Sequence, residues 1–232
     1  MPTLSIRDLR FSWPGQPTLL SIDQVDVGAG EVVMIHGPSG SGKTTLLSLM
    51  AGVITPQAGR IQVLGKTLTS LSAPARDRFR GEHIGFVFQQ FNLLPYLSVL
   101  QNVVLPAQLF SRRAERATQR SLSMIEEAQR LLSELGLESG VWRQPAHTLS
   151  VGQQQRVAVA RALMGSPELI IADEPTSALD EDRQRDFMRI LMQQVRATNA
   201  ACVMVSHQRS LGQWVDRMVE MASINPSVRA VA

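Results

Sequence analysis

A glycine-rich segment near the start of the chain carries the clearest chemical signal in the sequence. Gly37, Gly42, Lys43 and Thr44 are spaced as in the phosphate-binding loop pattern G-x-x-x-x-G-K-[ST]. Glycines let successive backbone N–H groups converge on one anion, and the start of a following helix adds the positive end of its dipole. We therefore expect Lys43 to reach the β- and γ-phosphates of a nucleotide and the Thr44 hydroxyl to bind Mg²⁺.

Two adjacent carboxylates follow an apolar run in the second half of the chain. Asp173 and Glu174 come directly after the apolar residues 169–172. A strand that ends in two acids is ordinary when taken alone. Beside a phosphate-binding loop, however, Asp173 can hold a Mg²⁺-bound water, and Glu174 can polarise the attacking water as a general base. The two motifs together predict nucleotide hydrolysis.

A third segment, residues 149–153, reads Leu-Ser-Val-Gly-Gln and precedes an alanine-rich apolar run. Ser150 is a natural N-cap, because its hydroxyl can accept a hydrogen bond from a backbone N–H of the first helical turn. The start of that helix would form a second anion site. One ATP could then lie between the loop at residues 37–42 of one copy and this segment of a second copy.

Two hydrophobic patterns in the sequence predict the strands that must position these motifs. Near the N-terminus, apolar residues alternate at period two, which predicts strands; these residues are Leu4, Ile6, Leu9, Phe11 and Trp13. Three later apolar runs have the length of buried strands; they are residues 32–35, 169–172 and 202–205. Helical stretches separate these runs, including one from Lys43 to Ala51 that should stop at Gly52. A mostly parallel sheet follows from that alternation.

The middle third of the chain predicts helices inserted into this α/β core. From Arg112 onward apolar residues recur at helical spacing; they are Leu122, Ile125, Ala128, Leu131 or Leu132, and Leu135. Arg112, Arg116 and Arg120 recur every four residues and would share one helix face. A solvated face is the leading interpretation, with contact to anionic lipid or an acidic partner as the alternative.

Composition excludes several classes of protein. The 232 residues are 44% hydrophobic and 19% charged, which is typical of a globular domain and excludes a disordered or collagen-like chain. The one cysteine, Cys202, fits a reducing compartment. No apolar run approaches the ~18 residues that a transmembrane helix needs, and no signal peptide is recognisable. We expect a cytosolic chain, and a net charge of +3 gives no reason to expect nucleic acid as a partner.

Taken together, these motifs resemble the nucleotide-binding subunits of ABC transporters over nearly the whole chain. The resemblance identifies residues 149–153 as the family's signature, with Ser150, Val151, Gly152 and Gln153 facing the nucleotide of a second copy. It makes residues 169–173 the Walker B strand, with Asp173 at the metal and Glu174 as the catalytic carboxylate. The Walker A residues that would bind the phosphates are Gly37, Pro38, Ser39, Gly40, Ser41, Gly42, Lys43, Thr44 and Thr45.

The same resemblance gives roles to single residues elsewhere. Gln89 matches the glutamine of the family's Q-loop, which reaches both the metal and the reacting phosphate. Asp180 ends the segment matching the D-loop, residues 177–180, and His207 stands where the switch histidine contacts the γ-phosphate. An aromatic residue of the first strand usually stacks on adenine; Trp13 is the better match and Phe11 the runner-up.

The resemblance implies an α/β fold with three parts. They are a P-loop NTPase core with a mostly parallel sheet, an N-terminal antiparallel β subdomain, and an α-helical subdomain at about residues 90–165, all within one domain of residues 1–232. It implies a subunit that dimerises around two ATP with Mg²⁺ and drives a separate integral membrane permease from the cytoplasmic face of the inner membrane. Residues 89–95 are similar to those of the lipoprotein-release and macrolide-efflux group.

The alternatives are another function within the same family and other classes of nucleotide-hydrolysing protein. A regulatory relative would signal across the membrane to cell-wall enzymes without transporting anything. DNA-repair ATPases of the family carry a long coiled coil before the signature, translation-associated members carry two cassettes, and kinases or GTPases lack the signature. The sequence has no room for the coiled coil, has one cassette and carries the signature, so these three classes do not fit, whereas the signalling output stays open as the alternative function.

Two segments depart from the family pattern. Val151 stands where the signature usually has glycine, and valine disfavours the positive φ that glycine permits. Either the loop is impaired, or φ at Val151 is negative and valine is tolerated; we favour the second. Residues 222–226 also replace the glycine turn and strand that commonly follow in the family.

Overall fold

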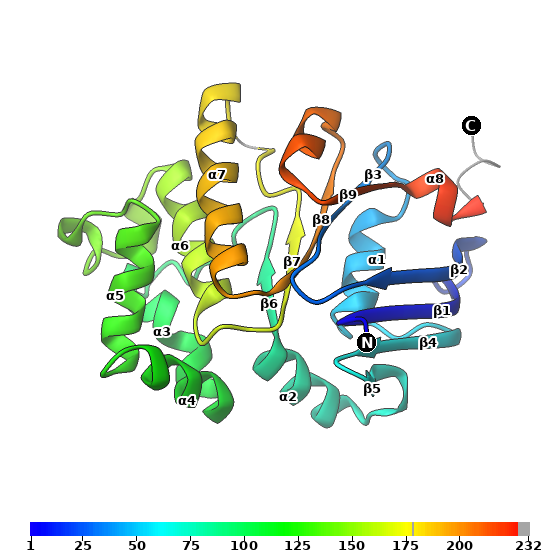
Figure 1. The fold of residues 1–232 in the computed structure, drawn as a ribbon, viewed down its shortest axis with the longest axis horizontal. Coiled ribbons are helices and arrows are strands. Elements are labelled where there is room, and N and C mark those ends of the chain that lie inside the picture. The colour runs from blue at the N-terminus through cyan, green and yellow to red at the C-terminus, as the bar shows by residue number, and fades with distance from the viewer. Residues whose placement is uncertain (178, 227–232) are drawn as a thin grey trace. The chain divides into compact units, whose positions relative to one another are not determined.

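The computed structural model describes residues 1–177 and 179–226 and divides into two compact units (Figure 1). The first unit contains Met1–Arg80, Ile171–Glu174 and the described residues from Ala201 onward. The second contains Gly81–Ile170 and Pro175–Ala200. In the described parts of the chain, no helix is both long and apolar enough to cross a bilayer.

An antiparallel sheet forms one half of the first unit. Its strand order is β2-β1-β4-β5, with the hairpin of β1 (Leu4–Ser12) and β2 (Thr18–Val27) on one side. Strands β4 (Ala58–Val63) and β5 (Lys66–Thr67) complete it. Leu4, Ile6 and Leu9 are fully buried, as their alternation predicted.

A parallel sheet forms the other half, in the order β7-β8-β3-β9. β3 (Val32–His36) lies parallel to β8 (Ala201–Ser206) and β9 (Arg217–Glu220), while β7 (Leu169–Asp173) begins in the second unit and ends in the first. Every residue of β7 and β8 is buried, because these central strands are covered on both faces. The remaining elements of this unit are α1 (Lys43–Met50), a 3-10 turn (Leu68–Ser70), most of α2 (Ala73–His83), a second 3-10 turn (Arg209–Trp214) and the short α8 (Met221–Ile224).

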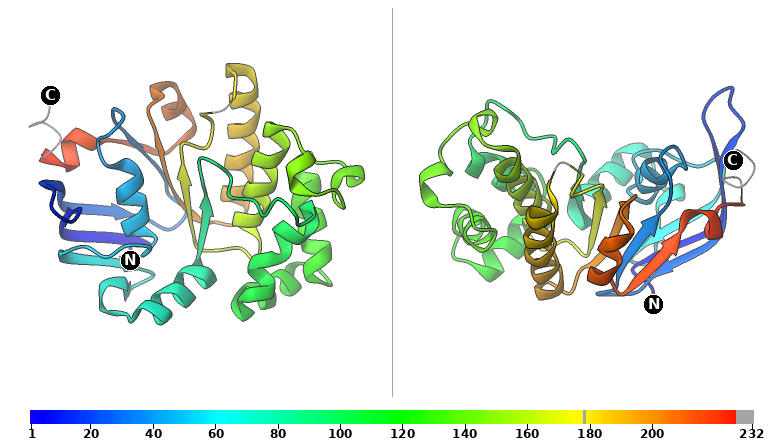
Figure 2. Two further views of the ribbon diagram at one scale, coloured as in Figure 1. Left: turned by 180° about the vertical axis from the view of Figure 1, so that it is seen from behind. Right: turned by 90° about the horizontal axis from the view of Figure 1, so that it is seen from above.

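The second unit is mainly helical and contains strand β6 (Ile84–Val87), which neighbours β7 in the sheet order. Its helices are α3 (Val99–Leu109), α4 (Ser111–Arg120), α5 (Met124–Glu134), α6 (Val151–Leu163) and α7 (Glu181–Ala197), with 3-10 turns at Ser139–Val141 and Ala146–Thr148. Helices α3, α4 and α5 pack on one another, and α6 packs on α3 (Figure 2). Apolar residues of each, such as Val103, Leu131 and Val157, form the core.

The helical spacing from Arg112 to Leu135 does not belong to one continuous element. The helix breaks between α4 and α5, because Ser121 and Ser123 adopt extended backbone and Ser123 caps α5 by accepting from the backbone N–H of Glu126. Leu122 is therefore 93% exposed instead of buried, and Ile125 is half exposed. Ala128, Leu131, Leu132 and Leu135 are buried as predicted.

The arginine face of α4 is solvated in part: Arg112 and Arg120 are exposed, as the leading interpretation predicted, whereas Arg116 is largely covered. Arg116 forms a two-pronged ion pair with Glu168, and Arg120 donates to the Ser166 hydroxyl at 2.9 Å. Arg112 lies 3.7 Å from the same carboxylate. Arg116 and His83 hold the Glu168 carboxylate in its charged form strongly enough to outweigh its burial, so that the pKa of Glu168 falls to about 2. Arg116 thus anchors α4 to the segment before β7, at the edge of an otherwise exposed face.

Candidate functional site

The glycine loop between β3 and α1 has the backbone that a phosphate-binding loop requires. Gly40 and Gly42 have φ of 78° and 92°, values that L-residues with a side chain rarely adopt. Gly37 has no such φ, but a Cβ there would lie 2.8 Å from the Cβ of Met221. Glycine is thus required at Gly40 and Gly42 by backbone angle and at Gly37 by close approach.

Lys43, the first residue of α1, folds back over this loop. Its side chain is buried, and Nζ donates to the carbonyl oxygens of Gly37 and Pro38, each at 2.8 Å. Ser41 Oγ donates to the same Pro38 carbonyl at 2.8 Å. The lysine cation therefore lies at the rim of the loop whose exposed residues are Pro38, Ser39 and Gly40, with Thr44 exposed and Thr45 half-buried at the start of the helix. An anion bound there would meet this cation directly.

Thr44 and Asp173 bring two oxygen donors together beside the loop. Thr44 Oγ1 donates to Asp173 Oδ1 at 3.2 Å, although the two residues are far apart in sequence. Asp173 is 6% exposed, and its burial raises the pKa of the carboxyl; the nearby Glu174 adds to that rise, whereas Thr44 and Lys43 oppose it. Hydroxyl and carboxylate oxygens are the donor types that Mg²⁺ prefers, and a cation would relieve the buried charge. The donor set fits a magnesium site.

Glu174 and His207 form a second pair at the carboxyl ends of β7 and β8. His207 Nδ1 lies 2.6 Å from Glu174 Oε2, and the backbone N–H of Glu174 donates to the Val205 carbonyl at 3.1 Å. Glu174 has φ of 46°, which is rare for a residue with a side chain and costs on the order of 1–3 kcal/mol. Such strain concentrates at functional sites, because the surrounding structure must hold the side chain at one angle. Here it turns the carboxylate toward the imidazole.

One aromatic residue lies exposed just after the first strand, which ends at Ser12 and not at Trp13 as the alternation predicted. Trp13 follows β1 and is 41% exposed, whereas Phe11 is buried and packs edge-on against it, with ring centroids 5.1 Å apart and planes at 86°. Phe11, the runner-up for stacking on adenine, is therefore part of the core. Trp13 remains available for that role.

In the second unit, the segment 149–153 forms the start of α6. Ser150 is the N-cap: its Oγ accepts from the backbone N–H of Gln153 at 3.3 Å, and Gln153 Oε1 accepts from the backbone N–H of Ser150 at 3.0 Å. Val151 is the first helical residue, is half exposed, and is not among the residues with positive φ. The prediction that valine adopts an ordinary backbone here is confirmed. A Cβ at Gly152 would meet no atom within 4 Å.

A pocket of about 520 Å³ opens in front of this helix start. It is lined by residues of α6 and its cap, by Gly136, by Leu179 just before α7, and by two residues of α7; those of α6 and its cap are Ser150, Val151, Gly152, Gln153, Gln155 and Arg156, and those of α7 are Arg183 and Phe187. Arg156 and the helix N-terminus give this pocket a positive side, whereas Arg183 pairs with Asp180 at 3.3 Å. The segment that ends at Asp180 thus borders the same pocket as the residues at 150–153.

Two buried glutamines that the sequence analysis did not single out hold this bordering segment. Gln155 Nε2 donates to the Pro175 carbonyl, and Gln184 Nε2 donates to the carbonyls of Thr176 at 3.2 Å and Leu179 at 2.9 Å. The sequence signal that could have identified them is an amide side chain on the apolar face of each predicted helix. Asp180 caps α7 by accepting from the backbone N–H of Arg183 at 3.0 Å. Ala178, within the predicted D-loop, lies outside the described residues.

Gln89 lies just beyond β6 and is exposed. The loop that follows it is held in an unusual shape, because Phe91 and Asn92 have φ of 58° and 48°. Arg161 of α6 donates to both of their carbonyl oxygens, at 2.6 and 2.7 Å. Thus Lys43, Thr44, Asp173, Glu174 and His207 gather in the first unit, whereas Gln89, residues 150–153 and Asp180 belong to the second.

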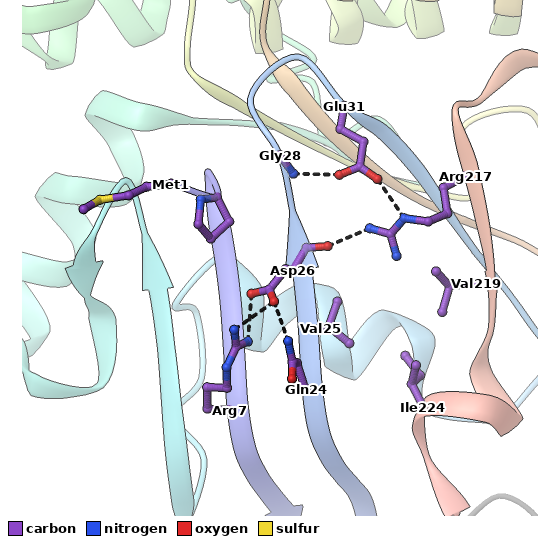
Figure 3. Close-up of a pocket in the computed structure, with 11 residues that line it drawn as sticks. Met1, Arg7, Gln24, Val25, Asp26, Gly28, Glu31, Arg217, Val219 and Ile224 are labelled. Atoms are coloured by element: carbon purple, nitrogen blue, oxygen red, sulfur yellow. Dashed lines mark hydrogen bonds and ion pairs between the residues drawn. The ribbon is translucent and has the colours of Figure 1, made fainter.

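A hollow of about 800 Å³ in the first unit lies beside β1, β2 and β9 (Figure 3). Its charged side chains pair with one another: Arg7 binds Asp26 at 2.7 and 2.8 Å, and Arg217 binds Glu31 at 2.7 Å. The hydrogen bond from Arg7 lowers the pKa of Asp26 to about 2. These pairs neutralise the wall of the hollow, which therefore lacks the uncompensated positive charge of a phosphate site.

Comparisons with known proteins agree with this geometry. The sequence model of the family described as ABC transporter matches residues 20–177. The lipoprotein-releasing system ATP-binding protein LolD of Nitrobacter hamburgensis is 38% identical over 224 residues, which are 95% of this chain and 93% of that protein. The macrolide export ATP-binding/permease protein MacB of Shigella flexneri is 39% identical over 223 residues, 95% of this chain and 33% of that protein. The chain thus spans about a third of the length of MacB.

Among solved structures, the dimeric post-hydrolysis state of the ATP-binding cassette MJ0796 bound to ADP and Pi has a TM-score of 0.80 to this chain. The two are 32% identical, and the match covers 94% of this chain and 93% of that one. The α/β fold class predicted from the sequence, with an antiparallel N-terminal sheet, a parallel core sheet and a helical part, is confirmed.

Proposed function

The chain belongs to the ABC transporter family as an ATP-binding, ATP-hydrolysing cassette, and on that premise we propose how its residues share the work. The phosphates of ATP lie on residues 37–45, with Lys43 leaving the carbonyls of Gly37 and Pro38 for the terminal phosphates. Trp13 stacks on the adenine. The observation that carries the proposal is the convergence of Lys43, Thr44, Asp173, Glu174 and His207 in one unit.

Hydrolysis then needs positioning and charge stabilisation more than covalent chemistry. Glu174 accepts a proton from the attacking water, and its strained backbone fixes the direction of the carboxylate. His207 holds Glu174 through the contact at 2.6 Å and offers its other ring nitrogen to the γ-phosphate. Lys43 offsets the negative charge of the phosphates.

Thr44 and Asp173 are the residues that would hold Mg²⁺, with Gln89 as a further oxygen donor. An ion held by these residues would supply positive charge that offsets the charge developing on the phosphates. The burial of Asp173 supports this assignment, because a carboxyl with a raised pKa gains most from a neighbouring cation.

A second copy of the chain completes the site in this proposal. Ser150, Val151, Gly152 and Gln153 of one copy face the γ-phosphate held by the other, and Asp180 follows directly after Leu179, which lines the same pocket. The dimeric state of MJ0796 supports this arrangement. Residues 1–232 act as one nucleotide-binding domain, with about residues 90–165 as its helical insert.

The dimer drives an integral membrane permease from the cytoplasmic face of the membrane. LolD and MacB are the relatives that support a lipoprotein-release or efflux type of system. The half-exposed Phe91, Leu93 and Leu94 are the proposed contact for a cytoplasmic helix of the permease. We expect Leu94→Glu to uncouple ATP hydrolysis from transport while Leu122→Glu, at an exposed site between helices, does not; equal transport in both would contradict this contact.

The chain's two lysines provide the test of nucleotide binding. Lys43→Ala should reduce ATP hydrolysis by roughly a hundredfold or more and weaken ATP binding, because the buried cation at the loop is lost. Lys66→Ala is the matched control, since Lys66 is exposed on β5. ATPase assays and fluorescent-nucleotide titrations measure both. Equal activity in the two variants would overturn the proposal.

A further inference from the structure

The two ends of the phosphate-binding loop are each approached closely by a side chain from another element. At one end, a Cβ on Gly37 would lie 2.8 Å from the Cβ of Met221, the first residue of α8. At the other end, a Cβ on Gly42 would lie 2.9 Å from a methyl of Leu20 and 3.4 Å from Leu19, both in β2. The loop is therefore confined between α8 and β2.

A buried asparagine ties these two walls together. Asn225, directly after α8, is fully buried. Its Oδ1 accepts from the backbone N–H of Ser21 at 2.8 Å, and its Nδ2 donates to the carbonyl of Leu19 at 2.9 Å. Because β2 is an edge strand, this amide occupies hydrogen-bonding positions that a further strand would otherwise fill.

Little else secures α8. The helix has four residues, and Ile224 lines the 800 Å³ hollow together with Val25 and Val219 instead of entering the core (Figure 3). Met221 in the helix and Asn225 directly after it are fully buried. A helix this short gains little stability from its own hydrogen bonds, so its position depends on these two side chains.

We propose that the segment from Met221 to Asn225 is a brace that positions the phosphate-binding loop, with Met221 and Asn225 as positioning residues. The inference rests on the proposed binding of ATP phosphates at residues 37–45. Removing the Asn225 amide leaves a part-buried donor and a part-buried acceptor of β2 without their partner and frees α8 from β2. The loop then loses the wall that confines Gly37, and its N–H groups no longer converge as well on phosphate. Met221 and Asn225 thus serve nucleotide affinity, and Asn225 belongs to residues 222–226, which depart from the family pattern.

Asn225→Ala in the full chain is the test, with Ser223→Ala as the matched control on the exposed side of α8. We expect the KM for ATP and the dissociation constant of a fluorescent ADP to rise roughly tenfold in Asn225→Ala, with kcat within about twofold. A merely structural role would lower the melting temperature and the active fraction but leave KM unchanged. Ser223→Ala should keep wild-type values.

Met221→Ala is a second test of the brace in case Asn225→Ala does not fold. It should also raise KM and leave kcat unchanged. If both variants fold and bind ADP as wild type, or if only their melting temperatures fall, the brace is excluded. Lys43→Ala in the same titration distinguishes failure of the brace from failure of the proposed ATP binding. Loss of ADP binding in Lys43→Ala with normal binding in Asn225→Ala overturns the brace alone, whereas no binding by wild type overturns the proposed function.

Discussion

The two loops proposed to hold one nucleotide are built in different ways. In the first unit, Gly40 and Gly42 have positive φ, Gly37 is crowded by Met221, and Lys43 is buried. In the second unit, residues 150–153 form an ordinary capped helix start whose first residue, Val151, is half exposed. The first loop needs particular backbone angles, whereas the second needs only a cap and free N–H groups.

This difference explains why a departure from the family pattern is tolerated in one loop. The donors at the start of α6 are backbone groups, which do not depend on the side chain at Val151. At Gly42 a side chain would meet both an unfavourable φ and the methyl of Leu20. The comparison predicts large effects of small substitutions in the first loop and small effects in the second.

One added methyl group tests the comparison with the largest expected contrast. Gly42→Ala should weaken ATP binding by about a hundredfold or more and lower the free energy of unfolding by ~1–2 kcal/mol, because alanine resists the left-handed backbone. Gly152→Ala should leave the ATP affinity of the single chain unchanged and raise helix stability by up to ~1 kcal/mol. Nucleotide titration and urea unfolding measure both. Equal losses in the two variants would break the comparison.

Val151→Gly tests the second loop directly. Since Val151 already has helical backbone, restoring glycine should change the permease-stimulated ATPase rate by less than about tenfold, or ~1.4 kcal/mol in the barrier. The rate is measured with the reconstituted permease complex. A gain of a hundredfold or more would show that valine impairs the loop.

The smallest expected effect comes from the electrostatic cost of burying the ionised Asp173 carboxylate. Burial raises the pKa of Asp173, so its ionised form destabilises the ligand-free fold above that pKa, and the penalty fades as pH falls toward the ordinary value of 3.8. Asp173→Asn should therefore raise the melting temperature by about 2 °C or more at pH 7, with the difference shrinking in acid. Asp180→Asn is the control at the second loop, because asparagine caps α7 equally well. A lower melting temperature for Asp173→Asn at pH 7 would contradict the claim that the ionised Asp173 destabilises the ligand-free fold.

Local patterns in the sequence predicted much of this structure. The alternation in β1, the glycine loop before α1 and the cap at Ser150 each depend on residues close together in the chain. The break at Leu122 was missed because that residue continues the helical spacing, and two flanking serines end the helix instead.

Contacts between distant segments could not be predicted in the same way. Arg116 pairs with Glu168, 52 residues further along the chain, and Asn225 accepts a hydrogen bond from Ser21, 204 residues before it. No periodicity encodes such pairs, because they depend on how the elements pack. Gln155 escaped notice for the same reason: its partner, the Pro175 carbonyl, is a backbone group with no sequence signal.

The central claim is that Glu174 in one unit and the capped helix start of a second copy act on the same ATP. Light scattering of Glu174→Gln with ATP and Mg²⁺ tests it most directly, because glutamine keeps the shape of the side chain but cannot act as a base. We predict retained ATP affinity, turnover lowered by roughly a hundredfold or more, and a mass twice that of one chain. The double variant Lys43→Ala, Glu174→Gln should stay monomeric. A Glu174→Gln protein that remains monomeric with ATP and hydrolyses it at the wild-type rate would contradict the account.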